Sequence, residues 1–160
     1  MRTDNTDFTW RIFDESPTID EYSRLIASVE WKPRDVEAVE IALRSSCFDV
    51  TARVGEEAVG MGRIVGDGAL HFFLCDVVVD PRFQKRGIGR AIVQRLDEWV
   101  RARPYPNTLV SLTARLGTEK LYGSVGYRDF GDRALMKWIN GKGSVSTAER
   151  GCADTQKEGT

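Results

Sequence analysis

The first part of the chain alternates apolar and polar residues in a way that predicts one strand followed by two helices. Residues 8–13 alternate as a strand does. Thr18 and Glu21 form a capping-box pair just before apolar residues at helical spacing, which predicts a first helix. Pro33 is a residue that can open a second helix, whose apolar positions are Val36, Val39, Ile41 and Leu43.

The middle of the chain predicts three consecutive strands and then a long amphipathic helix. The strands are expected at residues 48–54, 58–65 and 70–79, and the turn Gly66-Asp67-Gly68 precedes the third. Residues 87–101 carry apolar side chains at i, i+4 and i+8, as a helix with one buried face does.

The last elements are expected to be a strand at 108–113, a short helix at 118–124, and strands at 127–130 and 135–138. This order implies an α/β (α+β) fold with a mixed sheet and helices on its faces. We expect a single domain over residues 1–139. Residues 140–160 are polar and have little to bury, so we expect a disordered C-terminal tail there.

Composition and charge exclude several classes of function. The chain has 160 residues, and its 23 basic and 24 acidic residues nearly cancel, which favours neither nucleic acid nor a membrane surface as partner. A single histidine and three cysteines without C-x-x-C spacing predict no metal site. We see no signal region and no apolar run of membrane-spanning length, so we expect a cytoplasmic protein.

The stretch with the clearest chemistry follows the strand that ends at Asp80-Pro81. Gly87 and Gly89 open the long helix, whose first amides and positive dipole end suit an anion, and lysine and arginine side chains surround them. A Rossmann fingerprint is not met because Ile92 occupies its last glycine position, and a Walker P-loop lacks its Gly-Lys-Ser/Thr. Two glycines could also serve only to shape a loop.

The pattern Q-x-x-G-x-G after V-V-V-D-P, formed by Gln84, Gly87 and Gly89, resembles motif A of the GCN5-related N-acetyltransferase (GNAT) family. Residues 121–127 resemble the family's second signature, a short helix that carries a tyrosine and precedes an aromatic strand. The resemblance implies a mostly antiparallel sheet, splayed between strands four and five, with helices on both faces. It also implies acetyl-CoA as co-substrate.

By this resemblance, three groups of residues make the site. The backbone of Val77, Val78 and Val79 would pair with the pantetheine arm of coenzyme A. Tyr122 would donate a proton to the leaving thiolate. The diphosphate would be held by Gln84, Lys85, Arg86, Gly87, Ile88, Gly89 and Arg90. Residues 114–117 depart from the family pattern by lacking a common Asn, and Lys85-Arg86 replaces a commoner small pair.

The general base is not determined by the resemblance. Strict alternation from residue 71 to residue 79 predicts Asp76 on the face of Phe72, Leu74 and Val78, opposite the face that carries His71 and Cys75. Asp76 precedes the pantetheine-pairing residues and is the first candidate, although a structural aspartate fits the sequence equally well. His71, Glu119 and a chain of water molecules are the other candidates.

The leading hypothesis is transfer of an acetyl group to a primary amine of a small molecule in one ternary complex, without an acyl-cysteine. The alternatives are acetylation of a protein N-terminus or lysine, and a non-catalytic module that senses acyl-CoA. The sequence leaves the oligomeric state open, with a homodimer as one option.

Overall fold

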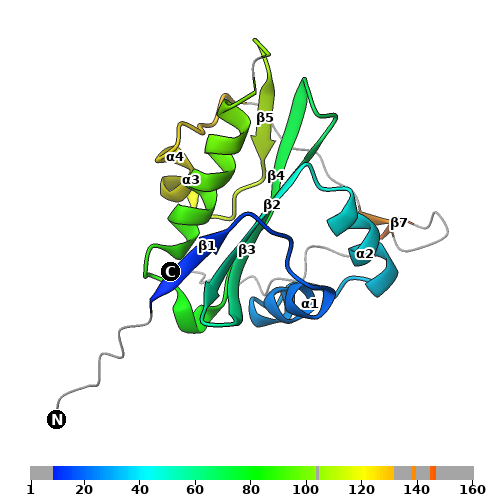
Figure 1. Cartoon of the computed structure of the whole chain (residues 1–160). Coiled ribbons are helices and arrows are strands. Elements are labelled where there is room, and N and C mark those ends of the chain that lie inside the picture. Colours follow the sequence, from blue (N-terminus) through cyan, green and yellow to red (C-terminus); the bar gives the residue numbers. More distant parts are fainter. Residues whose placement is uncertain (1–8, 104, 132–137, 140–144, 147–160) are drawn as a thin grey trace, which may run out of the picture.

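The computed structural model describes residues 9–103, 105–131, 138–139 and 145–146. Its centre is a five-stranded sheet in the order β1-β2-β3-β4-β5, antiparallel except for the parallel pair β4–β5 (Figure 1). The strands are β1 (Trp10–Phe13), β2 (Phe48–Val54), β3 (Glu57–Gly66), β4 (His71–Val79) and β5 (Leu109–Leu112). The predicted mixed, mostly antiparallel sheet is confirmed.

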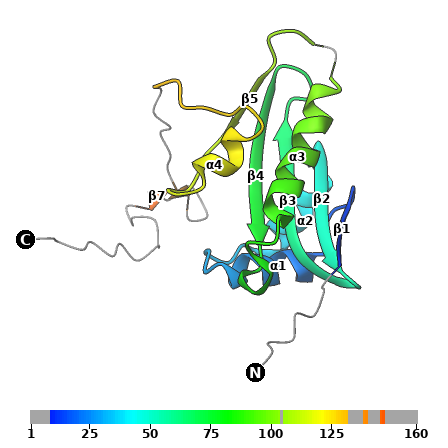
Figure 2. The same cartoon turned by 90° about the vertical axis from the view of Figure 1, so that its left-hand side faces the viewer.

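Helices cover both faces of this sheet, as predicted (Figures 1 and 2). The α1–α2 face carries α1 (Ile19–Ser28) and α2 (Val36–Arg44), and the opposite face carries α3 (Ile88–Arg101). A 3-10 turn, η1 (Pro81–Phe83), leads from β4 to α3, and α4 (Glu119–Gly123) follows β5. Two further short strands, β6 (Trp138–Ile139) and β7 (Val145–Ser146), pair with each other.

The sheet separates two apolar cores. The core under α3 combines buried residues of β2, β3 and β4 with Ile88, Ile92 and Leu96. The core under α1 and α2 combines Leu25 and Ile26 with residues from the other face of β3 and β4. Burial of such side chains is the main force that holds helices on a sheet. Within the described ranges, no helix is both long enough and apolar enough to cross a membrane.

The helix starts follow local chemistry. Thr18 Oγ1 accepts a hydrogen bond from the Glu21 amide at 3.2 Å, and the Glu21 carboxylate accepts one from the Thr18 amide at 2.8 Å, so the predicted capping box is present. Pro33 does not open the second helix. Asp35 caps it instead, accepting from the Ala38 amide at 3.0 Å, and the helix begins at Val36.

The C-terminal elements differ from the prediction. Residues 127–130 form no strand; Asp129 instead accepts from the Gly131 amide at 2.7 Å, and Gly131 has φ +87°, so the chain turns there. Residues 135–137 lie outside the described residues, and Trp138 belongs to β6. Of the predicted tail, the structure describes only Val145–Ser146, so that prediction stays a prediction.

Candidate active site

β4 loses its neighbour halfway along its length. β5 pairs with His71 to Leu74 only, so among the described residues the edge of β4 away from β3 has no strand partner from Cys75 to Val79. We call residues 75–79 of this edge the open edge. The Asp80 amide donates to the Val59 carbonyl at 2.9 Å, toward β3. Because backbone groups alternate along a strand, those of Val78 also face β3, and those of Val77 and Val79 face the open edge.

A β-bulge interrupts β4 at Asp76. The register passes from Arg63↔Cys75 to Met61↔Val78, so one residue of β3 faces two of β4, and Asp76 has φ +51°. The strict alternation predicted for residues 71–79 is therefore wrong. Phe72, Leu74, Val77 and Val79 pack in the α3 core, and Val78 packs in the core under α1 and α2.

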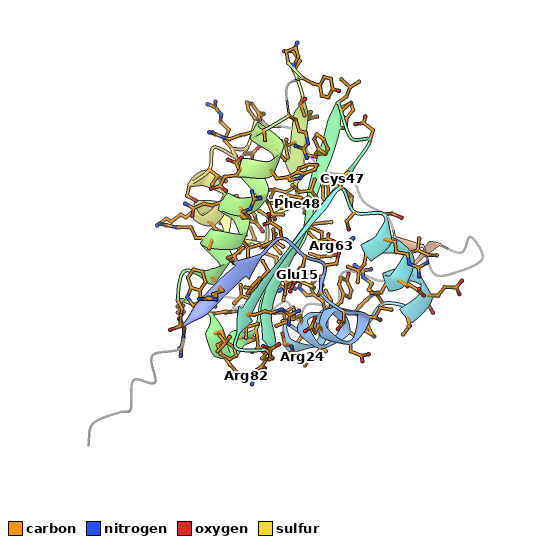
Figure 3. The ribbon with its side chains drawn as sticks, viewed as in Figure 1. Glu15, Arg24, Cys47, Phe48, Arg63 and Arg82 are labelled. Atoms are coloured by element: carbon orange, nitrogen blue, oxygen red, sulfur yellow. The ribbon has the colours of Figure 1, made fainter. Side chains whose placement is uncertain are left out.

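The loop after β4 is held by a buried carboxylate. Asp80 is 4% exposed and accepts hydrogen bonds from the Arg82 amide and from the Arg82 guanidinium. These bonds hold the pKa of Asp80 below its usual value, although burial opposes them. At the same turn Arg82 also pairs with Glu57, and Arg24 lies 3.7 Å from Glu57 and 3.8 Å from Asp80. Figure 3 labels Arg24 and Arg82.

The start of α3 has the properties of an anion site. Gly87 caps the helix with φ +85° and no side-chain hydrogen bond, and the first helical amide that is paired belongs to Ala91, which donates to the Gly87 carbonyl. The amides of Ile88, Gly89 and Arg90 have no partner within the described residues. Gln84 to Gly87 and Arg90 are exposed, and only the Ile88 side chain is buried. The segment is therefore open, and its amides can receive an anion.

The second glycine of the loop lies between three elements. A Cβ atom placed on Gly89 would lie 3.6 Å from Val79 Cγ2 and 3.8 Å from Leu121 Cδ2, which are ordinary contact distances. The end of β4, the start of α3 and helix α4 therefore converge here. Packing within the protein does not require a glycine at residue 89, whereas close approach of a ligand to its backbone would.

Tyr122 follows Leu121 on α4, next to this convergence. It packs against the α3 core, and its ring meets that of Tyr127 edge to face, with 6.3 Å between the centroids. Burial raises the pKa of the Tyr122 phenol, so the hydroxyl stays protonated near neutral pH and can donate a proton. Tyr122 also borders a hollow of about 780 Å³ formed by β5, α4 and residues 125–130. No residue of the 84–90 loop lines that hollow, so it is not the predicted diphosphate site.

The three candidate bases lie in different surroundings. Asp76 is bound to Tyr22 and Arg63, each at 2.9 Å from its Oδ2. His71 is exposed at the start of β4, and Glu119 is exposed at the start of α4 and borders the hollow. The structure does not bring these three side chains together.

Two contacts at this site were not predicted from the sequence. Arg115, in the segment after β5, lies over the ring of Trp31, in the segment after α1, with 5.2 Å from its Cζ to the ring centroid. Arg63 binds Asp76. A signal for the second contact was present, because a charged residue within the apolar strand 58–65 needs a buried partner. The Arg115–Trp31 contact has no local signal.

Comparison with known proteins gives a consistent result. The sequence profile of the Acetyltransferase (GNAT) family matches residues 8–127. The chloroplastic GCN5-related N-acetyltransferase 1 of Arabidopsis thaliana is 33% identical over 93 residues, which are 57% of this chain and 47% of that protein. Histone acetyltransferase TAP1 of Glycine max is 26% identical over 129 residues, which are 72% of this chain and 55% of that protein. The chain thus spans about half the length of these relatives.

The solved structures agree on the fold. A protein of Staphylococcus aureus described as a probable acetyltransferase superposes with a TM-score of 0.76 and 26% identity, covering 82% of this chain and 99% of that one. One sequence-based expectation is contradicted by the relatives. The Arabidopsis protein is chloroplastic, so the prediction of a cytoplasmic protein is corrected. The absence of a recognisable signal region does not determine the compartment.

Proposed function

The chain belongs to the GNAT acetyltransferase family, and we propose that it transfers the acetyl group of acetyl-CoA to a primary amine of a small molecule. The observation that carries this proposal is the convergence of Val79, Gly89 and Leu121, which puts the open edge, the unpaired helix amides and the Tyr122 helix side by side. Acetyl-CoA supplies an activated thioester carbonyl. The protein supplies binding, orientation and protons.

Different groups of residues bind different parts of the co-substrate. The amides of Ile88, Gly89 and Arg90 receive the diphosphate, and Lys85, Arg86 and Arg90 add positive charge. The backbone groups of Val77 and the amide of Val79 pair with the pantetheine arm. The Val79 carbonyl already accepts from Gln84 at 2.9 Å, so Gln84 shapes the loop against β4.

The proposed chemistry is direct attack of the amine on the thioester. Burial raises the pKa of the Cys75 thiol to about 12, so this thiol is a poor nucleophile and supports no acyl-cysteine. Tyr122 protonates the departing thiolate. The ammonium form of an alkylamine dominates near neutral pH, by about a thousandfold or more. We assign its deprotonation to water, because Asp76 is engaged by Arg63 and Tyr22.

A specific contact favours a small acceptor. Trp31 and Arg115 contact each other across the segments that follow α1 and β5, and we propose that this contact narrows the approach of an acceptor to the site. A polypeptide acceptor would need an open groove there. The second candidate is acetylation of a protein, and it is favoured by the similarity to the Glycine max protein named a histone acetyltransferase.

The test follows binding and turnover separately. Acetyl-CoA at about 100 times its dissociation constant should stabilise the fold by about 2.7 kcal/mol in thermal unfolding. Release of free thiol is then measured against a panel of small primary amines, histone peptides and N-terminal peptides. We expect turnover with small amines. Turnover with peptides alone would support the second candidate, binding without any turnover would support a sensor, and no binding at millimolar acetyl-CoA would reject the proposal.

A further inference from the structure

The bulge at Asp76 is held by a buried hydrogen-bond network from three other segments. Asp76 Oδ2 accepts from the Tyr22 hydroxyl and from Arg63 Nε, both at 2.9 Å. Arg63 Nη1 also donates to the Ala42 carbonyl at 3.0 Å and to Ser46 Oγ at 2.8 Å. The network therefore connects the bulge to β3, to α1 and to the end of α2. Figure 3 shows Arg63 on the α1–α2 side of the sheet.

This network is shielded from water and charged. The Arg63 side chain is 8% exposed and that of Asp76 is 12% exposed. A buried ion pair with further hydrogen bonds fixes geometry, because each member loses much if its partner moves. Burial and the Asp76 charge raise the pKa of the Tyr22 phenol, so Tyr22 remains a hydrogen-bond donor at neutral pH.

The opposite face of the bulge is equally constrained. Gly62 faces the two bulge residues, and a Cβ atom placed on it would lie 2.7 Å from Ile92 Cγ2, 2.8 Å from Leu96 Cδ1 and 3.4 Å from Val77 Cγ2. Helix α3 thus packs directly on the backbone of β3 at this level, beside Val77. The bulge is held between α3 on one face and the Tyr22–Arg63 pair on the other.

We propose that Tyr22 and Arg63 are positioning residues, which hold the bulge through Asp76 and so direct the Val77 backbone at the open edge. This inference rests on the proposed function, because the Val77 backbone matters only if the thioester arm binds beside it. Asp76, at φ +51°, has a conformation that residues with a Cβ atom adopt reluctantly and that Asp and Asn tolerate best. A conformation of that kind persists where the surroundings impose it.

The inference makes Asp76 a positioning residue and not the general base. The two roles predict different turnover for variants of Asp76. Asn keeps an oxygen that accepts from Arg63 and Tyr22 and tolerates the same backbone angle. Asp76→Asn should therefore retain at least a tenth of the turnover, whereas Asp76→Ala should lose a hundredfold or more. A general base would make Asn as inactive as Ala and would abolish the acid limb of the pH–rate profile.

The deciding experiment uses Tyr22→Phe, which removes one hydroxyl, with Tyr105→Phe at an exposed position as the matched control. We expect Tyr22→Phe to raise the acetyl-CoA dissociation constant severalfold, to lower kcat about tenfold, and to leave the shape of the pH profile unchanged. The Val77 amide signal in nitrogen-15 NMR should shift in Tyr22→Phe without ligand, but not in Tyr105→Phe.

Wild-type values of the Val77 signal and of kcat in Tyr22→Phe would overturn the inference. If Tyr22→Phe fails to fold, the ratio of Asp76→Asn to Asp76→Ala turnover decides. If the wild-type chain binds no acetyl-CoA, the proposed function fails, and the unliganded Val77 signal still reports whether Tyr22 holds the bulge.

Discussion

The side-chain amide of Gln84 donates a hydrogen bond to the Val79 carbonyl, with 2.9 Å between Nε2 and O. Gln84 lies in the loop and Val79 at the end of β4, so this bond brings the loop back to the open edge. The first residue of the Q-x-x-G-x-G pattern therefore has a structural task that the other two do not share. It holds the start of the loop against the end of β4.

Replacement of Gln84 by Glu tests this task. The carboxylate has nearly the same shape but cannot donate to the Val79 carbonyl, and it adds negative charge beside the proposed diphosphate site. We expect the dissociation constant of acetyl-CoA to rise at least about tenfold, or about 1.4 kcal/mol. Calorimetric titration measures it. Gln94→Glu, at an exposed position of α3, is the matched control and should bind as the wild type does.

Gly89→Ala tests whether a glycine at residue 89 is required for stability or for binding of acetyl-CoA. The added methyl group makes only ordinary contacts with Val79 and Leu121, and alanine is preferred to glycine in a helix by about 0.5–1 kcal/mol. Thermal unfolding should therefore show equal or higher stability, while acetyl-CoA binding weakens about tenfold or more. Gly87→Ala should instead destabilise the protein, because its φ is +85°. Undiminished binding by Gly89→Ala would contradict a diphosphate at this backbone.

Tyr122→Phe removes the proposed proton donor while keeping the ring. Turnover should fall by about 10²–10³-fold, with the affinity for acetyl-CoA unchanged. Tyr127→Phe is a stringent control, because this neighbouring phenol is also half-buried and burial raises its pKa to about 12. It should remain active. Equal losses in both variants would indicate packing of the two rings and not proton donation.

Asp80 makes the stability of the loop depend on pH. Arg82 lowers the pKa of the folded Asp80 below its usual 3.8, so above pH 3.8 the ionised carboxylate contributes its full stabilisation to the fold. That stabilisation is lost as the pH falls through the lowered pKa. Asp80→Asn should reduce the free energy of unfolding by about 1–3 kcal/mol at about pH 7. Urea unfolding should show the gap between the two proteins closing as the pH falls below 3.8 and through the lowered pKa of Asp80. A gap independent of pH would mean that the Asp80 charge is not involved.

Local sequence signals predicted most of the framework. The Thr18–Glu21 capping box, the boundaries of β2 and the loop between β4 and α3 depend on residues a few positions apart, and all are present. The prediction of a strand at 127–130 was wrong, also because of a local signal. Its pattern was suitable, but the Asp129–Gly131 turn was the stronger local preference.

What the sequence determined by itself is the order of elements from β1 to α4 and the family, because spacing along the chain encodes both. Only the tertiary structure decided where β4 bulges, where β5 leaves it, and which partners hold Asp76. Arg63 lies 13 residues from Asp76 and Tyr22 lies 54, and no periodic pattern encodes such pairings. They arise when two helices pack on one face of a finished sheet and a buried charge must find its partners.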